Sequence, residues 1–582
     1  MATTFFNPTK DTWMTSFKEN KPIVFLFQDK LCPACYSFEQ TVLSDPEVQE
    51  YLFSNFLPVH LDINRFPDLY ERFAGNDFLV HTIQAINGNL LGSCNNLSVS
   101  HFLKNLYQYK QISQQIQDPF QDVLTLQDFS PLIQEEAKRF HEKIDLISEI
   151  TLSTLLGAYD SMYGGWAVQK HKIYPSSALD FLLLFHQRSQ DEELLKIIIQ
   201  TLRATYRGLF DKQNGGFFES ANRDWKTVLS FKKSLENNVS AARTLFHSYQ
   251  LTLDPYYLDK IRETLVFCLN DLWNKKQGLF NYGLLAHPLY DLTNELFLSR
   301  GNCEIISLLY EVEGIIDLPT HKKELDKIKS SVLKRLRKSE TPYGIPHELS
   351  SGKRHPYKQF LLQDQAAYLN LFIQLYSFTG RAIYRKRAIS FVNLIIEHYF
   401  DLKNNLFKDR VSIPETDFGP LMKNLFPIRD NAFMVNNLVT LSHLTEKPTH
   451  RPYRELATNC VTSYYSNFGI SREAPFPPEF VIANQRLIES AIELVIIGSI
   501  KDKKTQQLMI EMKKIYDPFS IIELFDPNKD KQMMELKFKD YNFHNPPLAF
   551  IKIDSTISPP AYYPKEISLM LQRLLEAFRS DV

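Results

Sequence analysis

A turn pattern that recurs at the ends of long helical segments constrains the fold more than any other feature of the sequence. Between residues 135 and 490, amphipathic helical segments such as "DEELLKIIIQTLRATYRGLF" dominate, and strand signals are few. Most of the turns combine an aromatic residue, an Asp, a polar stretch, small or Asn residues and a second aromatic. The four examples are "YDSMYGGW", "FDKQNGGFF", "WNKKQGLFNYG" and "FDLKNNLFKDR".

The spacing of these turns predicts stacked helical hairpins. Asp160 and Asp211 are separated by about one hairpin and its connections, and self-similarity at a period of about 20–50 residues is typical of repeated helix pairs. Such hairpins can close into a solenoid or a ring, and the sequence leaves both open. We expect both Asp residues to close turns, because Asp side chains hydrogen-bond their own backbone there.

Two flanking segments have α/β character. In the first, the run Ile23–Phe27 is typical of a buried strand, a second strand is expected at 57–63, and Asn87-Gly88 predicts a hairpin turn. The last segment carries the strands "IELVIIG", "SIIELF" and "LAFIKI" and a closing helix, "PKEISLMLQRLLEAF". The chain is therefore expected to be multi-domain and mainly α. The predicted domains are 1–125, 135–490 and 491–582.

Length and charge exclude several classes of protein. A chain of 582 residues is too long for one hydrophobic core. Because Lys+Arg (66) and Asp+Glu (67) balance, we expect no nucleic-acid or anionic-membrane partner. No apolar run approaches the roughly 18 residues that span a bilayer, and the start lacks a secretory pattern. Six cysteines are too few for a disulfide framework, so a reducing cytoplasm is the expected compartment.

Cys32 and Cys35 form a C-x-x-C motif directly after the first predicted strand. A helix start at Cys32 would favour the thiolate over the thiol, and this context is typical of a thioredoxin-like redox motif. Cys32 would be the attacking nucleophile and Cys35 the resolving thiol. One alternative is a relic pair on a fold that only binds. Metal binding would need further ligands such as Cys94 and His81, since structural zinc takes four, and no metal is expected.

The chain resembles the spermatogenesis-associated protein 20-like family. The resemblance rests on "ENKPI", the C-x-x-C pair, "YDSMYGG" and "GGFFES…RDW", and it covers nearly the whole chain. It implies an N-terminal thioredoxin-like domain, a central (α/α)6 toroid of the six-hairpin glycosidase type, and a small C-terminal α/β segment packed on the toroid.

The sequence departs from this family at groups that could transfer protons. The family typically has C-H-W-C-H where this chain has "CPACY", and H-F-E-K-M-L-Y-D-N-A where it has "SFKKSLENNV". His, Glu and Asp are thereby replaced by Ser230, Lys232 and Asn237. Thioredoxin enzymes also carry a cis-proline facing the motif, and no proline occurs at the corresponding place, near residues 79–81.

The resemblance also implies a funnel in which aromatic side chains and paired carboxylates hold a carbohydrate. A glycosidase needs two carboxyl groups about 5–5.5 Å or 6.5–9.5 Å apart. Asp364 and Asp430 are candidates, although each also fits a helix start, and Asp160 is a third. Arg223 is expected to pair with Asp224 while Trp225 stacks on a sugar ring. The residues predicted to bind the ligand are Trp166, Arg223, Asp224, Trp225, Lys233, Glu236 and Asn238.

Three functional hypotheses follow. The first is thiol–disulfide exchange at the C-x-x-C, with a protein thiol partner, coupled to a toroid that binds a carbohydrate-like or peptide ligand. The second is a carbohydrate-active enzyme, hydrolase or epimerase, that uses the funnel. The third is a non-catalytic scaffold. No nucleotide-binding or serine-hydrolase motif is present, and no cofactor is expected. We also expect the N-terminal domain to dock on the toroid through apolar residues, namely Tyr36, Phe38 and residues 78–80.

Overall fold

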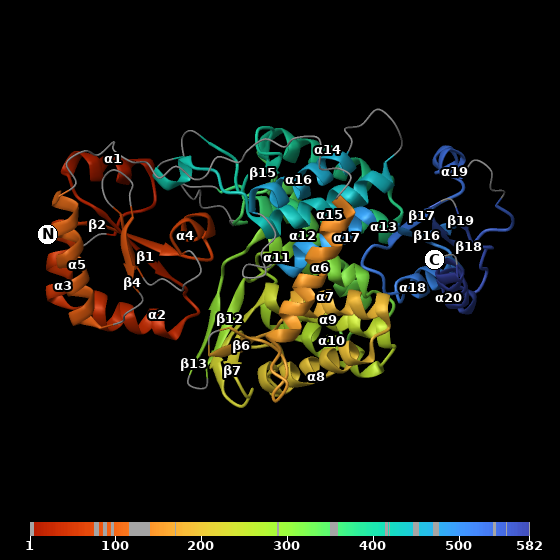
Figure 1. Cartoon of the computed structure of the whole chain (residues 1–582), viewed down its shortest axis with the longest axis horizontal. Helices are drawn as coiled ribbons and strands as arrows, with labels where there is room; N and C mark the ends of the chain where they lie inside the picture. Colours follow the sequence, from red (N-terminus) through yellow and green to blue (C-terminus); the bar gives the residue numbers. More distant parts are fainter. Residues whose placement is uncertain are drawn as a thin grey trace.

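Three structural units follow one another along the long axis of the molecule (Figure 1). They are an N-terminal α/β unit (the N-terminal unit), a central ring of helices (the toroid) and a C-terminal α/β unit (the C-terminal unit). The predicted fold class, multi-domain and mainly α, is confirmed. The computed structural model describes residues 5–74, 81–84, 90–94, 98–115, 140–168, 170–287, 290–349, 359–413, 417, 419–445, 453–468, 476–538, 543–554 and 556–580.

The N-terminal unit is built on a four-stranded sheet of order β2-β1-β3-β4. Strand β1 is parallel to β2 and antiparallel to β3, and every residue of β1 is buried. The predicted turn at Asn87-Gly88 lies outside the described residues, but the strands that flank it pair antiparallel. The elements are α1 (Lys10–Glu19), β1 (Ile23–Gln28), α2 (Pro33–Phe38) with a π-helical turn (Glu39–Leu43), α3 (Pro46–Asn55), β2 (Leu57–Asp62), α4 (Pro67–Ala74), β3 (His81–Gln84), β4 (Leu90–Cys94) and α5 (Val99–Gln115).

The toroid is a closed ring of helical hairpins. Among the described residues, six inner helices contact one another in sequence, α7 to α9, α11, α13, α15 and α17, and α17 returns to contact α7. An outer helix packs on each inner helix. Ring closure decides between the two arrangements that the sequence left open. The inner helices are α7 (Ser176–Ser189), α9 (Leu235–Thr252), α11 (Ser299–Glu311), α13 (Leu362–Thr379), α15 (Ile428–Leu444) and α17 (Pro478–Ile488); the outer ones are α6 (Phe140–Gly157), α8 (Glu192–Leu209), α10 (Pro255–Phe267), α12 (Lys322–Ser339), α14 (Ala382–Tyr399) and α16 (Tyr453–Phe468).

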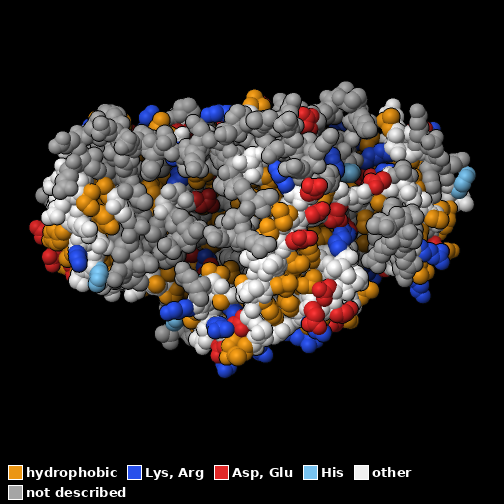
Figure 2. Space-filling view, in the orientation of Figure 1, with side chains coloured by type: hydrophobic (Ala, Val, Ile, Leu, Met, Phe, Trp, Pro, Cys, Tyr) orange, Lys and Arg blue, Asp and Glu red, His pale blue; other side chains and the backbone are white. Residues whose placement is uncertain are grey.

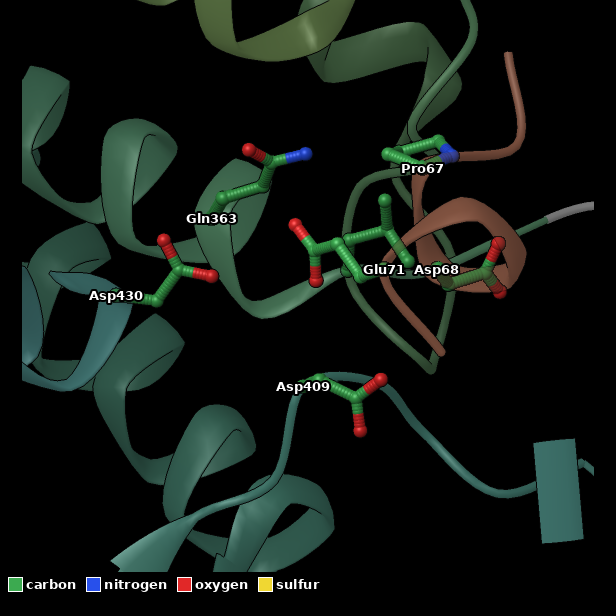
Figure 3. Close-up of a pocket in the computed structure, with 7 residues that line it drawn as sticks. Pro67, Asp68, Glu71, Gln363, Asp409 and Asp430 are labelled. Carbon is green, nitrogen blue, oxygen red and sulfur yellow. The ribbon is translucent and has the colours of Figure 1, made fainter. Parts of the chain in front are cut away.

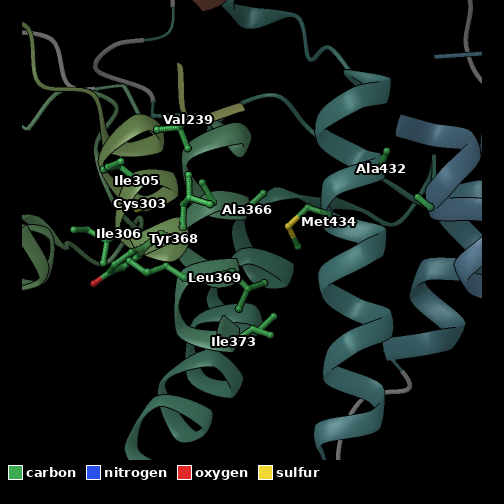
Figure 4. Close-up of a cluster of buried hydrophobic side chains, with 14 of the residues drawn as sticks. Val239, Cys303, Ile305, Ile306, Ala366, Tyr368, Leu369, Ile373, Ala432 and Met434 are labelled. Carbon is green, nitrogen blue, oxygen red and sulfur yellow. The ribbon is translucent and has the colours of Figure 1, made fainter. Parts of the chain in front are cut away.

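Buried apolar side chains fill the space between neighbouring helices of the ring. Figure 4 shows part of this core, where Cys303 and Ile306 of α11 lie close to Ala366 and Leu369 of α13, with Met434 of α15 alongside. The helical periodicity that predicted these segments is thus the pattern that buries one face of each helix. On the surface, acidic and basic side chains are interspersed on the face shown in Figure 2. None of the described helices is both long and apolar enough to cross a membrane.

Short strand pairs connect the hairpins at the recurrent turns. They hold the turns against the ring, and one three-stranded sheet, β13-β12-β9, extends toward the N-terminal unit (Figure 1). A short helical turn (Gly419–Met422) lies between α14 and α15. The strands are β5 (Ala167–Val168), β6 (His171–Ile173), β7 (Ser220–Asn222), β8 (Val228–Ser230), β9 (Lys232–Ser234), β10 (Trp273–Asn274), β11 (Leu279–Phe280), β12 (Gly283–His287), β13 (Tyr290–Asn294), β14 (Phe400–Asp401) and β15 (Leu406–Phe407).

The C-terminal unit packs against the C-terminal ends of the inner helices. Gln187 of α7 and Gln250 of α9 each donate a hydrogen bond of 2.7 Å to its backbone, at the carbonyls of Tyr516 and Lys513. The unit has a four-stranded sheet of order β17-β16-β18-β19. Its elements are β16 (Ile492–Ile497), α18 (Lys503–Met512), β17 (Ile521–Phe525), α19 (Lys531–Lys537), β18 (Leu548–Ile553), β19 (Thr556–Ile557) and α20 (Pro564–Ser580).

Candidate functional site

Cys32 is the residue that caps the N-terminus of α2, as the sequence predicts. Its Sγ accepts a hydrogen bond of 3.4 Å from the backbone N–H of Cys35. Cys32 keeps part of its surface exposed, whereas Cys35 is buried one turn further into the helix. Hydrogen bonds from Cys35 lower the pKa of Cys32 to about 7, against the opposing effects of burial and Asp29. The hydrogen bond and burial raise the pKa of Cys35. One thiol is therefore poised to ionise near neutral pH and the other is not.

The turn before Cys32 is where the N-terminal unit meets the toroid. Leu31 is fully buried in an apolar cluster formed by the toroid residues Tyr282, Leu285, Leu296 and Leu298. It lies close to Gly283 of β12: a Cβ there would be 3.3 Å from the Leu31 methyl, although the closer neighbour, at 2.7 Å, is the Lys233 carbonyl oxygen of the adjacent strand. The side chain next to the reactive cysteine is thus an anchor between two units.

A buried ion pair accompanies this apolar contact. Lys232 Nζ lies 2.7 Å from Asp29 Oδ2 and 3.1 Å from Glu219 Oε1, and its side chain is 9 % exposed. Burial alone would lower the pKa of Lys232, but Tyr282, Glu219 and Asp29 together hold it well above its ordinary value. The family that this chain resembles has Glu at this position. The lysine that replaces this potential proton-transfer group joins the two units instead.

A second set of contacts holds α4 and the loop before it to the segments that precede α13 and α15. His347 hydrogen-bonds the Asn64 carbonyl (2.9 Å) through Nε2 and Asp364 (2.8 Å) through Nδ1. Burial lowers the pKa of His347, but Asp364 outweighs it and raises the pKa to about 9, so at neutral pH the imidazolium donates both bonds. Arg72 adds an ion pair of 2.7 Å to Asp409.

The N-terminal unit does dock on the toroid, but not through the apolar residues that the sequence suggested. Phe38 is buried in the core of its own unit, and Tyr36 is 61 % exposed. Residues 78–80 lie outside the described part of the chain. The contact is instead made by Leu31, by the toroid residue Leu421, which packs in the core of the N-terminal unit, and by a series of polar pairs that ends at Arg72.

Docking creates a pocket between α4 and the inner helices. The space between the atoms there, including the part open to solvent, is about 230 Å³. Figure 3 shows Glu71 projecting from α4 into it, with Gln363 and Asp430 on the facing helices. Its lining residues are Pro67, Asp68, Glu71, Leu361, Gln363, Asp409 and Asp430.

The carboxylates of the pocket fall into two kinds. Asp409 is paired with Arg72, and Asp68 accepts a hydrogen bond of 3.0 Å from Gln359. Glu71 and Asp430, by contrast, have no hydrogen bond or ion pair with any other described residue. An ionisable group without a partner is available to a ligand.

Glu71 and Asp430 also have the most strongly perturbed acidities in the pocket. The Glu71 side chain keeps part of its surface exposed, but desolvation by the surrounding protein and the negative charges of Asp430, Asp409 and Asp68 raise its pKa to about 7. Burial raises the pKa of Asp430 to about 6, against the opposing charge of Arg300. Near neutral pH one carboxyl can carry a proton while the other does not.

Of the residues predicted to bind a ligand, Glu236 is the one that the structure brings near this pocket. It stands in the first turn of α9 and interacts electrostatically with Arg300, Asp364 and His347. Burial raises its pKa, with Arg300 opposing. Glu236 has no hydrogen bond or ion pair within the described part of the chain.

Lys233 and Asn238, predicted to bind the ligand, are instead used to hold turns. Lys233 Nζ is buried and contacts Asp211 (2.6 Å) and the Gly215 carbonyl (2.7 Å). The Asn238 amide accepts from the Phe217 N–H (2.6 Å) and donates back to its carbonyl (3.3 Å). Asn302 and Asn431 hold the corresponding turns before α11 and α15 in the same way.

The predicted aromatic and Arg–Asp residues likewise lie outside the pocket. Trp225 is buried, and its Nε1–H donates to the Tyr163 carbonyl (3.0 Å), while that of Trp166 donates to the Leu155 carbonyl (2.7 Å). Arg223 pairs with Asp160 (2.8 Å) instead of Asp224. The Asp160 side chain also accepts a hydrogen bond of 3.3 Å from the Tyr163 N–H, as its predicted turn role requires. Asp224 is paired with the exposed Lys226.

Sequence reasoning missed Glu71. Its helix carries the segment "PDLYERF" with an amphipathic pattern, but nothing in that pattern shows that α4 faces a helix more than 300 residues away. The available signal was an acidic residue on an amphipathic helix.

Comparison with known proteins confirms the resemblance read from the sequence. The chain is 24% identical to human spermatogenesis-associated protein 20 over 288 residues, which is 45% of this chain. The matched part is about a third (36%) of that protein. No protein-family model matches the chain.

Solved structures with a similar arrangement include a D-mannose isomerase (13% identity, TM-score 0.48) and the cellobiose 2-epimerase from Spirochaeta thermophila (12% identity, TM-score 0.45). Each match covers 61% of this chain and 99% of the other. An unsaturated glucuronyl hydrolase specific for heparin matches over 60% of this chain (12% identity, TM-score 0.41). At such low identity, the activities of these enzymes cannot be carried over to this chain.

Proposed function

We propose that the chain is a carbohydrate-active enzyme that transfers protons in the pocket between α4 and the toroid. One observation carries the proposal: Glu71 and Asp430 face the same pocket from two units, neither has a hydrogen bond or ion pair to another described residue, and their pKa values are about 7 and 6. An acid and a base whose pKa values lie near the working pH are what proton transfer requires.

Two reactions fit this pair of carboxyl groups. In glycoside hydrolysis, the protonated group would donate to the leaving oxygen and the ionised one would activate water or attack. In epimerisation or isomerisation, one group would remove a proton from carbon and the other would return one. The replacement of His, Glu and Asp by Ser230, Lys232 and Asn237 does not weigh against either reaction, because none of these positions lines the pocket.

The test is to incubate the full chain with a panel of mono- and disaccharides in D2O and follow them by NMR. Deuterium on a sugar carbon would indicate epimerisation or isomerisation, and a new reducing end without carbon-bound deuterium would indicate hydrolysis. We expect Glu71→Gln and Asp430→Asn each to lower kcat by about 10²–10⁴-fold. The matched control is Asp224→Asn, a partly exposed carboxylate outside the pocket.

The pH profile gives an independent check. Proton donation is lost as the pH rises through about 7, and the base is protonated as the pH falls through about 6, so kcat/KM should peak between these values. Full turnover by both pocket variants, or no turnover of any sugar by the wild type, would refute the proposal.

A second candidate function, thiol–disulfide exchange, is favoured by the geometry of the C-x-x-C motif. Cys32 is partly exposed, caps a helix start and has a pKa near 7, which suits an attacking thiolate. The experiment is to measure the reduction potential of the Cys32–Cys35 pair in glutathione buffers. Failure to form the disulfide in any such buffer would rule this function out.

A further inference from the structure

The turn from Asp29 to Cys32 is stiff. The Cys32 N–H donates to the Asp29 carbonyl (2.9 Å), and the Leu31 N–H donates to Asp29 Oδ1 (2.9 Å). Because Leu31 is fully buried against the toroid and Asp29 is paired with Lys232, the position of the cysteine relative to the toroid is fixed. The Cys32 sulfur therefore lies at the edge of the junction between the two units.

The toroid covers one side of Cys32. Leu31 precedes it and is inserted beneath β12, while Cys35 behind it is buried. Lys30, two residues before Cys32, is exposed, and so are Ala34, Tyr36 and Ser37 after it. A folded protein that presents a disulfide must rest on surface at both sides of the attacking sulfur, whereas a small disulfide needs only a narrow approach.

We infer that the docked toroid restricts Cys32 to disulfides of low molecular weight and excludes those of folded proteins. This inference rests on the thiol–disulfide exchange proposed above and names its substrate class. The Cys32 thiolate attacks one sulfur of R–S–S–R, forms Cys32–S–S–R and releases R–S⁻. Cys35 then attacks the Cys32 sulfur, gives its proton to the departing thiolate and releases the second R group as R–SH. The two cysteines lose two electrons, and the small disulfide gains them.

The test compares two oxidants on the reduced full chain. One oxidant is glutathione disulfide and the other is a folded protein with an exposed disulfide; the rate of oxidation by each is measured by mass spectrometry of quenched samples. The ratio of the two rates is then divided by the ratio of the rates at which the same two disulfides oxidise dithiothreitol, a small dithiol. We expect the protein disulfide to be disfavoured at least about 100-fold, the scale on which orientational constraints slow protein encounters. In the Cys35→Ser variant, a glutathione adduct should accumulate on Cys32 and a protein adduct should not.

Variants on the toroid side test whether docking is the cause. Leu285→Glu places a charge against Leu31 and should raise the rate with the protein disulfide at least tenfold. Leu292→Glu is the control, because Leu292 is paired with Leu285 on the next strand but is 45 % exposed. If neither oxidant reacts at Cys32, the exchange function itself fails. The size restriction is wrong, while exchange stands, if the wild type accepts both oxidants alike. It is also wrong if Leu285→Glu folds and leaves the ratio of the two oxidation rates unchanged. Where Leu285→Glu does not fold, the Cys35→Ser variant decides, and equal formation of the glutathione and protein adducts would overturn the restriction.

Discussion

Removing the Lys232 ammonium should loosen the N-terminal unit at one end of its contact with the toroid. In Lys232→Met, Asp29 stays buried and keeps only the Leu31 N–H as a partner among the contacts described above. Removing one member of a buried ion pair costs about 3–5 kcal/mol. We expect the lower end of this range, because Glu219 is 35 % exposed and is hydrated once the lysine is gone.

Hydrogen exchange measures this loss locally. A loss of about 3 kcal/mol multiplies the opening equilibrium by about 150-fold, since 1.4 kcal/mol corresponds to a factor of ten. Exchange should accelerate in peptides that cover residues 29–32 and β12, where the broken contact lies. Peptides that cover residues 64–72 should change little, because the His347 and Arg72 contacts are intact.

Two further variants identify the cause. Lys226→Met removes an exposed ion pair 3.4 Å long and should change exchange by less than about twofold, since such pairs contribute about 0–1 kcal/mol. Adding Asp29→Asn to Lys232→Met removes the stranded charge and should restore much of the protection. The reasoning is wrong if Lys232→Met exchanges within threefold of wild type, or if the double variant is no more protected than the single one.

Three shorter predictions concern other groups. The pKa of His347 in the folded protein, about 9, exceeds its ordinary value of 6.5, so its contribution to docking should be complete below pH 6.5 and lost as the pH rises through 9. Hydrogen exchange of residues 61–66 should accelerate over this pH range, beyond the intrinsic rate, in the wild type and not in His347→Gln. Asn238→Ala should lower stability to urea by about 1–3 kcal/mol, because it leaves the buried Phe217 N–H unpaired; an unchanged unfolding midpoint would contradict this. Alkylation of Cys32 should be half-maximal near pH 7, whereas Cys268, whose thiol pKa is raised by burial, should stay unlabelled in the native state.

Local patterns in the sequence predicted most of the elements. The buried strand expected at Ile23–Phe27 is β1, and the helix expected from "NNVSAARTLFHSYQLT" is most of α9 (Leu235–Thr252). These predictions hold because each element buries one continuous face, and burial leaves a periodic trace in the sequence. The turn role of Asp160 was also predictable, since its hydrogen bonds to Tyr163 and Gly164 are local.

Long-range contacts explain what the sequence could not predict. Lys233 and Asn238 were expected at a ligand, because a lysine or asparagine at a helix start suits that role equally well. Their actual partners, Asp211 and Phe217, are about 20 residues away and are fixed only when the hairpin folds. The Arg223 side chain could reach either Asp160 or Asp224, and sequence proximity favoured the wrong one.

The replacement at position 232 connects the two sites. The family that this chain resembles has Glu there, whereas this chain has a lysine that binds Asp29 of the N-terminal unit. A glutamate at this position would place a third carboxylate beside Asp29 and Glu219 and would oppose the docked arrangement found here. Docking in turn sets α4 over the inner helices and brings Glu71 opposite Asp430. The change from Glu to Lys232 thus removes one carboxyl group from the toroid. It also favours the docked contact through which the N-terminal unit supplies another carboxyl group, that of Glu71.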